Sequence, residues 1–166
     1  MTTAHTDAEL IAKVHAAVNA TRAVMVGVIG GEIHPFHPMK GHAVDGERSA
    51  WFICRRDVSL VREVGVESHA AIVNVVSEDH HLHASLQGEL TAERDQARID
   101  QFWSSVADAW LPEGRLSPDV ILLRFDPVSA EVWISDNSFT LAWEAAKANF
   151  KGQQITSGEK ASIRLA

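Results

Sequence analysis

The spacing of apolar residues near the N-terminus predicts one amphipathic helix. Leu10, Ile11, Val14 and Val18 recur at helical intervals, and Asp7 stands where an N-cap residue would accept a backbone N–H group of the first turn. From residue 22 onwards the helical spacing stops. Short apolar runs bounded by turn residues take its place.

Short apolar runs of this kind are typical of β-strands. The predicted strands are residues 23–29, 49–54, 70–76, 81–90, 120–125 and 130–134, with a further extended run ending at Ile33. The glycine pair at 30–31 predicts a hairpin turn, Asp126-Pro127 predicts a turn between the last two strands, and Gly88 predicts a bulge. The predicted additional helices are residues 57–64, capped by Asp57, 94–110 and 141–150.

The order of these elements favours a closed antiparallel barrel. Six or so short strands follow one another mainly through hairpins, whereas a parallel sheet would need a crossover between neighbouring strands. A length of 166 residues fits a single domain. We expect residues 1–150 to form this domain, including the N-terminal helix, and residues 151–166 to be a polar C-terminal tail.

Composition and charge exclude several classes of function. The chain has 15 basic and 22 acidic residues and a net charge of −7, which argues against nucleic acid or an anionic membrane surface as a partner. The single cysteine excludes a disulfide framework and a cysteine-rich metal site. The N-terminus lacks the pattern of a secretory signal and the apolar runs are too short to span a bilayer, so we expect a cytoplasmic protein.

Nine histidines raise the question of a metal site. The two clusters are His34, His37 and His42, and His80, His81 and His83. Each cluster offers about two convergent ligands, because alternate residues of a strand face opposite sides, and neither has a zinc-binding spacing. We therefore expect histidines at the surface or half-buried, and no metal centre.

A set of short phrases runs through nearly the whole chain in a characteristic order. The phrases are His37-Pro38-Met39, Trp51-Phe52-Ile53-Cys54, Glu63-Val64, a strand ending at Gly88, Phe102-Trp103, Trp110-Leu111-Pro112-Glu113-Gly114, Pro118-Asp119, Leu122-Leu123-Arg124 and Ala130-Glu131-Val132-Trp133. In this order and spacing they resemble the pyridoxamine 5′-phosphate oxidase-like FMN-binding split barrels. Within that family they resemble the general stress proteins.

The resemblance implies a fold, an assembly and a cofactor. The fold would be mainly β with flanking helices, a six-stranded antiparallel split β-barrel. The barrel would form a homodimer with FMN bound at the interface between the subunits. The residues that the resemblance places at the flavin are His37, Pro38, Met39, Phe52, Ile53, Cys54, Ser59, Leu60, His83, Trp110 and Trp133.

The phosphate end of this predicted site departs from the family pattern. An Arg that precedes Pro-Met in the family is His37 here, and a Ser-x-Lys pair of the family falls on Val58 and Leu60. These differences remove fixed positive charge that a phosphate would meet. Basic residues within a few positions offer replacement charge: Lys40, Arg55, Arg56 and Arg62.

The sequence leaves open whether the protein is an enzyme. Trp133 is followed by residues 134–139 without a basic side chain, which disfavours a true pyridoxamine phosphate oxidase because its phosphorylated substrate would find no counter-charge. An FMN-dependent oxidoreductase of the general stress type remains the first hypothesis, with no catalytic residue assigned. The alternative is a non-enzymatic ligand-binding or sensing protein whose phosphate clamp has been lost. A third hypothesis is haem with an axial ligand among His37, His81 and His83.

Overall fold

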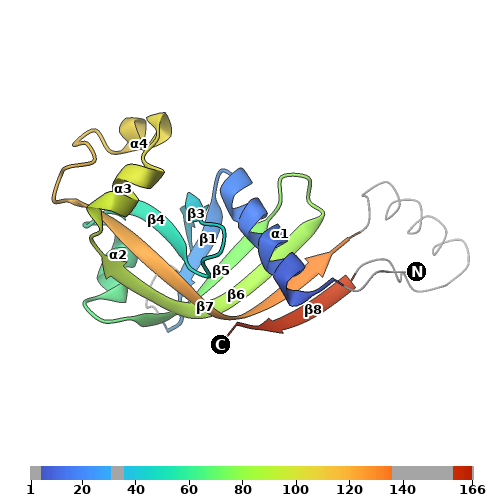
Figure 1. The fold of residues 1–166 in the computed structure, drawn as a ribbon. Helices are drawn as coiled ribbons and strands as arrows, with labels where there is room; N and C mark the ends of the chain where they lie inside the picture. Colours follow the sequence, from blue (N-terminus) through green and yellow to red (C-terminus); the bar gives the residue numbers. More distant parts are fainter. Residues whose placement is uncertain (1–4, 31–35, 136–158, 166) are drawn as a thin grey trace, which may run out of the picture.

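The computed structural model of the protein describes residues 5–30, 36–135 and 159–165. An antiparallel sheet with the strand order β2-β1-β5-β6-β7-β4-β3 curls into a half-barrel, and β8 adds to the free side of β7 (Figure 1). The strands are β1 (Val24–Val28), β2 (His37–Met39), β3 (Gly41–Ala43), β4 (Ala50–Arg55), β5 (His69–Val76), β6 (Leu82–Glu93), β7 (Val120–Ile134) and β8 (Glu159–Arg164). The predicted antiparallel split barrel is therefore confirmed.

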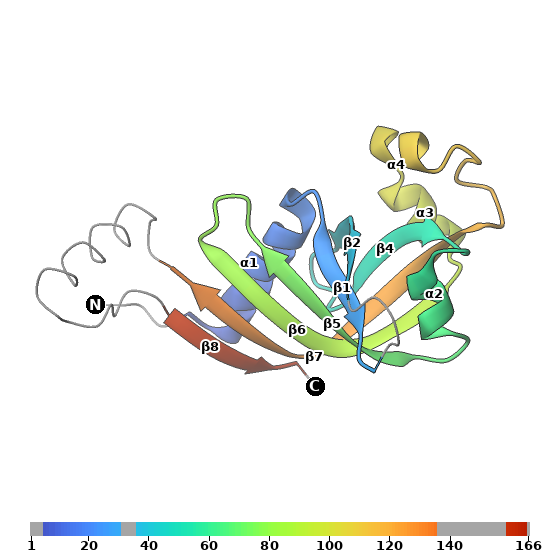
Figure 2. The ribbon, with the colours of Figure 1, turned by 180° about the vertical axis from the view of Figure 1, so that it is seen from behind.

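Four helices accompany the sheet in the part of the chain that the structure describes. They are α1 (Asp7–Ala20), α2 (Ser59–Val64), α3 (Gln96–Phe102) and α4 (Ser105–Trp110). Seen from behind, α1 and the pair α3–α4 lie toward opposite ends of the sheet (Figure 2). None of the helices in these ranges is long and apolar enough to cross a membrane.

Helix α1 begins with a capping box. The Thr6 hydroxyl accepts a hydrogen bond from the Glu9 N–H at 3.3 Å, and the Glu9 carboxylate accepts one from the Thr6 N–H at 2.8 Å. The predicted cap at Asp7 is therefore wrong by one residue, because the Thr-x-x-Glu pair satisfies two backbone donors reciprocally. The predicted apolar face is confirmed, with Leu10, Val14, Ala17 and Val18 buried.

One segment, residues 37–43, closes the barrel. Its first part, β2, pairs with β1, and its last part, β3, pairs with β4 at the other end of the sheet order. Only Lys40 separates the two strands, and its ammonium donates to the carbonyls of Asn19 and Thr21 at 2.6 and 2.8 Å. The Asn19 side-chain amide bonds both the N–H and the carbonyl of Ala43. These hydrogen bonds fix the corner at Lys40, where the chain passes from β2 to β3, to the C-terminal end of α1.

The two strands predicted at 120–125 and 130–134 form one continuous strand, β7. The predicted turn at Asp126-Pro127 is wrong, because β6 pairs with β7 along its length and a register shift at Gln87/Gly88 absorbs one extra residue of β7. Proline is tolerated in a sheet at such a bulge. The bulge predicted at Gly88 is confirmed. A Cβ atom at Gly88 would lie 2.2 Å from the Asp126 carbonyl oxygen.

Two other local predictions differ from the structure. Helix α2 has Val58 as its N-cap residue without a side-chain cap, because the Asp57 carboxylate accepts hydrogen bonds from Arg55. The helix predicted over residues 94–110 is split into α3 and α4, and the Ser104 hydroxyl caps the second helix. Val106, expected on the buried face, is 60% exposed in α4.

Alternation along β4 and β7 divides the core into two clusters. Phe52, Leu123 and Phe125 face the inner cluster, which fills the half-barrel beneath α1. Trp51 and Leu122 face the outer cluster, which packs against α3. The inner face is the larger of the two and is completed by Val and Leu residues of β5 and β6.

The C-terminal segment contributes to the sheet. We expected residues 151–166 to be a polar tail, but β8 pairs with β7 from Ser129 to Ile134, and Ile163 of β8 and the following Leu165 are buried in the inner cluster. These two apolar residues alternate with exposed Ser162 and Arg164, a pattern with the period of a strand. The helix predicted at 141–150 and the extended run ending at Ile33 lie outside the described residues.

A Gly88→Ala substitution tests the bulge. The added methyl group meets backbone atoms of Asp126 and Pro127, which cannot rotate away as a side chain could. We expect the free energy of unfolding to fall by about 1–3 kcal/mol in chemical denaturation. Ser85→Ala on the same strand is the control and should change it by much less. An unchanged midpoint for Gly88→Ala would contradict the packing described for β6 and β7.

Candidate functional site

The outward face of β6, β7 and β8 presents an exposed aromatic residue with polar neighbours. Trp133 is 38% exposed and stands opposite His83 on the adjacent strand β6. On its other side the ammonium of Lys160 lies 5.3 Å from the Trp133 ring centroid and forms an ion pair with Glu131 at 3.0 Å. An exposed indole face beside hydrogen-bonding groups suits a flat aromatic ligand.

The β4 residues predicted at the flavin are mostly buried. The side chains of Phe52 and Cys54 point into the inner cluster, and Ile53 packs against the outer one. Strand β3 pairs only with Ala50–Phe52, whereas β7 pairs with all of Ala50–Arg55. The stretch from Ile53 to Arg55 therefore extends beyond β3, and its backbone is the part of β4 that a ligand could contact.

Burial also decides the chemistry of the single cysteine. Loss of solvent raises the pKa of the Cys54 thiol to about 12. The thiol therefore stays protonated at neutral pH, and since the thiolate is the nucleophilic form, Cys54 is inert. Its place in the inner cluster is that of a small apolar residue.

The β2 and α2 residues occupy different environments. His37 and Met39 are half-buried on the side of β2 that faces the core, while Pro38 between them is exposed. In α2, Ser59 is half-buried at the first helical position, and Leu60 is 1% exposed within the inner cluster. Position 60 therefore points away from any ligand at the surface.

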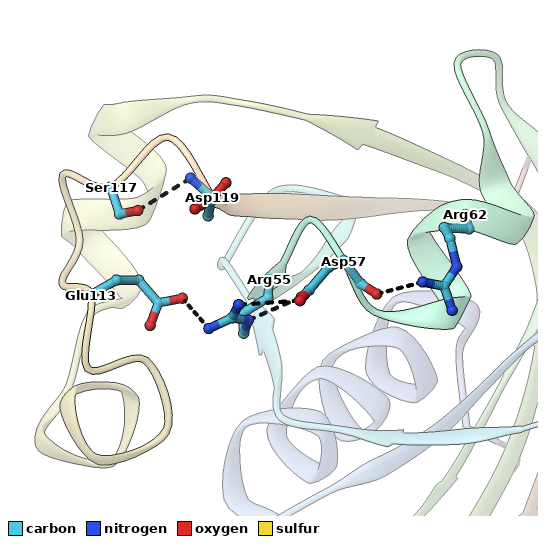
Figure 3. A network of polar contacts seen from close by, with 6 residues as sticks. All are labelled: Arg55, Asp57, Arg62, Glu113, Ser117 and Asp119. Carbon is cyan, nitrogen blue, oxygen red and sulfur yellow. Dashed lines mark hydrogen bonds and ion pairs between the residues drawn. The ribbon is translucent and has the colours of Figure 1, made fainter.

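A network of polar contacts surrounds the turn between β4 and α2 (Figure 3). The Arg55 guanidinium donates from Nε and Nη2 to the two carboxylate oxygens of Asp57 at 2.9 and 3.1 Å, and from Nη1 to Glu113 at 3.1 Å. The Arg62 guanidinium donates to the Asp57 backbone carbonyl at 3.1 Å. The hydrogen bonds from Arg55 lower the pKa of Asp57, and the same contacts raise the pKa of Arg55. Nearby, the Ser117 hydroxyl accepts a hydrogen bond from the Asp119 N–H.

The four basic residues that could replace the phosphate clamp have different hydrogen-bond and ion-pair partners. Lys40 is held by two carbonyls of the α1 end, and desolvation lowers its pKa. Arg55 already binds two carboxylates. Arg56 donates to the carbonyl of Pro118, and within the described ranges neither Arg56 nor Arg62 has a carboxylate within 4 Å.

Trp110 lies apart from the other predicted site residues. It is 79% exposed at the end of α4, a helix without a buried residue. Both views place α4 and β8 at opposite ends of the molecule, so Trp110 and Trp133 of one chain do not line a common site (Figures 1 and 2).

A small apolar pocket lies between α1 and the strands β6 to β8. Its volume is about 20 Å³, and its wall includes His15, Arg48 and Leu165. Small-molecule sites usually have volumes of about 300–1,000 Å³. This pocket cannot hold a flavin, and its apolar lining offers no set of groups for catalysis.

The histidine of β3 belongs to the packing of the outer cluster. The His42 ring stacks on Phe102 at a centroid distance of 4.7 Å. Phe102 in turn contacts Trp51, over which the Arg98 guanidinium lies at 4.5 Å while it pairs with Glu47. No group of three or more potential metal ligands is present in the described segments, and His34 lies outside them.

Sequence reasoning missed two residues of this region. One is Glu113, whose contact with Arg55 spans 58 positions and leaves no local signal in the sequence. Lys160 belongs to the segment that we expected to be a tail. An alternation of Lys160, Ser162 and Arg164 with Ala161, Ile163 and Leu165 was the available signal for a strand there.

Comparisons with known proteins show the family and the fold of the chain. The model of the family "Pyridoxamine 5′-phosphate oxidase like" matches residues 9–156. A general stress protein 26 from Jannaschia sp. CCS1 is 31% identical with a TM-score of 0.79, covering 95% of this chain and 99% of its own. The general stress FMN/FAD binding protein from Xanthomonas citri is 31% identical with a TM-score of 0.70, covering 78% and 92%. A general stress family protein from Xanthomonas campestris pv. campestris is 30% identical with a TM-score of 0.72, covering 81% and 93%.

The chain is therefore a split-barrel protein of the general stress type. It belongs to the pyridoxamine 5′-phosphate oxidase-like family. The comparison with curated proteins gives no match.

The environment of His42 makes the stability of the fold depend on pH. Desolvation, with a smaller contribution from the Lys40 charge, lowers the pKa of His42 from 6.5 to about 4. The fold favours the neutral ring, so its contribution to stability is complete above about pH 6.5 and is lost as the pH falls toward 4. His42→Phe keeps an aromatic ring on Phe102 without a titrating group. We expect its melting temperature relative to the wild type to rise steadily from pH 7 to pH 4.

Val66→Ala is the control for this measurement, because Val66 is fully exposed and carries no titrating group. Its difference from the wild type should change little over the same pH range. A difference between His42→Phe and the wild type that is independent of pH would contradict the stacked, neutral state of His42.

Proposed function

We propose that the protein binds a flavin, FMN in the first place, and that a homodimer completes the site. The observation that carries the proposal is the exposed Trp133 beside His83, near the end of β7, whereas α3 packs on the same sheet face near the start of that strand. Membership of the family supports it, as does the likeness to the general stress FMN/FAD binding protein. The side chains present offer an aromatic wall and hydrogen-bonding groups, which are what an isoalloxazine ring requires.

A second copy of the chain would supply what one copy lacks. The described pocket of a single chain is far too small for a flavin, and Trp133, Met25 and Val76 leave apolar surface on the outward sheet face. Apolar surface of this kind is typical of a protein interface. Between two copies, the aromatic wall of one sheet could meet the extended backbone of Ile53–Arg55 from the other, and the ring would be enclosed from both sides.

A bound flavin would supply electron and hydride transfer, and the protein would act by holding and orienting it. Among the described residues we assign no catalytic acid or base, so the proposed oxidoreductase activity would depend on the flavin itself. The outward surface next to Trp133 carries Lys160, which is already paired with Glu131. Because Lys160 is paired with Glu131, it offers no free counter-charge to the phosphate group of a substrate. We therefore do not propose pyridoxamine phosphate as the substrate.

A second candidate function is a split barrel that binds a ligand other than FMN. The observation that favours it is the position of Leu60, which is 1% exposed in the core. A phosphate cannot contact this position, and a lysine placed there would bury its charge at high cost. If the arginines of the β4–α2 turn do not supply the positive charge of the family's phosphate clamp, the phosphate of FMN would add little to the free energy of binding.

Titration of the purified protein with FMN tests the first proposal. We expect saturable quenching of tryptophan fluorescence at one flavin per chain. Trp133→Ala should weaken FMN binding about tenfold through loss of ring stacking, and Val66→Ala, at a fully exposed residue, should not. Absence of saturable binding by the wild type would overturn the proposal in favour of another ligand.

Light scattering tests the proposed assembly. We expect a mass twice the chain mass of 18.2 kDa at micromolar concentration. Apolar side chains on the uncovered face would become buried in such a dimer. Val76→Glu, which adds a charge to that face, should shift the equilibrium toward the monomer, whereas Val66→Glu should leave it unchanged. A monomeric wild type would contradict the assembly.

A further inference from the structure

Strand β8 places a positive charge beside the exposed indole of the candidate site. Lys160 stands opposite Trp133 in the pairing of β8 with β7, and its ammonium lies over the indole ring at 5.3 Å from the centroid. The same ammonium forms an ion pair with the Glu131 carboxylate at 3.0 Å. Glu131 and Trp133 are two residues apart on one strand, so both project from the same face of the sheet. A cation and an anion therefore stand next to the aromatic wall of the proposed flavin site.

These side-chain contacts contribute little to the stability of the fold. The side chains of Lys160 and Glu131 are 53% and 47% exposed, and water and salt screen an ion pair with this exposure. Holding the long lysine side chain in one geometry also costs conformational entropy. Strand β8 is held by its backbone pairing with β7 and by the buried side chain of Ile163. The strand does not require the ammonium over the indole, and this charge is available to act on a ligand at Trp133.

A flat ring bound to Trp133 would lie within range of the Lys160 charge. Stacked aromatic rings have centroids about 4.5–7 Å apart. Since the ammonium lies 5.3 Å from the indole centroid, it lies within about 12 Å of the centre of a stacked ring, whichever face of the indole the ring uses. The Debye length at physiological salt is about 8 Å, so a charge at this site acts on the ring, whereas charges farther along the sheet are largely screened.

We propose that Lys160 raises the reduction potential of a flavin bound at Trp133 and that Glu131 limits this effect. The inference rests on the flavin-binding function proposed above. The Lys160 ammonium favours a ring that has taken up two electrons and one proton over the oxidised ring, because the reduced ring carries one negative charge and the oxidised ring is neutral. The Glu131 carboxylate disfavours the reduced ring for the same reason. The ion pair between the two side chains sets how much of the positive charge the ring meets.

The two charges leave a signature that a packing role for Lys160 would not produce. Because they oppose each other, loss of the lysine charge and loss of the glutamate charge shift the potential in opposite directions. Loss of both charges leaves the potential close to that of the wild type. The shifts become smaller as the ionic strength rises, since salt screens both charges.

Midpoint potentials of bound FMN, measured against a reference dye during reductive titration, test the proposal. We expect Lys160→Met to weaken the binding of reduced FMN about two- to fivefold relative to oxidised FMN, which lowers the potential by about 10–20 mV for this two-electron couple. Glu131→Gln should raise the potential by a similar amount. Lys160→Arg keeps the charge and should keep the potential of the wild type.

The matched control is Arg164→Met. Arg164 is an exposed cation on the same face of β8, four residues and therefore about 13 Å along the strand from Lys160. Its replacement removes the same net charge from the same strand, so the potential should change much less than in Lys160→Met. For the glutamate, Glu89→Gln removes an exposed negative charge six residues along β6 from His83 and should likewise have little effect.

The outcomes separate this proposal from the flavin-binding function. If every variant binds FMN and Lys160→Met has the potential of the wild type, the role of Lys160 is overturned while flavin binding stands. An equal shift in Lys160→Met and Arg164→Met would also overturn it, because the effect would then be that of net charge alone. Equal weakening of oxidised and reduced FMN by Lys160→Met would make Lys160 a simple binding contact. If the wild type binds no flavin, both proposals fail.

Discussion

The barrel depends on the short segment that changes partners at Lys40. Residues 37–39 pair with one end of the sheet order and residues 41–43 with the other, so a single corner joins two edges that would otherwise stay open. The Lys40 ammonium binds carbonyls at the C-terminal end of α1, where unsatisfied acceptors and the helix dipole favour a cation. Gly41 permits the close approach, since a Cβ atom there would lie 2.7 Å from a methyl group of Val18. One set of contacts therefore closes the barrel and holds α1 against it.

This closure decides on which side of the sheet a ligand can bind. With α1 fixed over the concave side, the interior is filled by aliphatic and aromatic residues, and the cavity left beneath the helix has a volume of about 20 Å³. A ligand of the size of a flavin is excluded from the inside of the barrel. On the outward face, α3 packs against Leu122 near the start of β7, and the strand period brings Trp133 and His83 to the same face near the end of that strand.

The sequence predicted well those features that depend on periodicity and poorly those that depend on distant contacts. Helix α1, most strands and the bulge at Gly88 followed from spacing and from glycine chemistry. Pro127 indicated a turn because proline cannot donate to a ladder, but a bulge in β7 accommodates it while β6 continues alongside. The resemblance to the family names Trp133 and His83 as candidates, and the two are neighbours in the fold. It could not show that Phe52, Cys54 and Leu60 are buried, nor that Arg55 meets Glu113, because those facts depend on tertiary packing.

The orientation of α2 explains why a phosphate clamp in this chain would use other positions than the family pattern suggests. The helix packs into the core through Leu60, Val61 and Val64, which fixes its rotation. At helical spacing the positions then left toward solvent include 59 and 62. A charged side chain at position 60 would have to move to solvent, and this would disrupt the packing of α2 against the core. Arg62 instead donates to the Asp57 carbonyl from the surface, without disturbing any apolar contact. Positive charge at this turn is therefore compatible with the fold only on residues such as Arg55 and Arg62. The aliphatic residue at position 60 is a packing requirement of the helix, and it does not by itself decide whether an anion binds nearby.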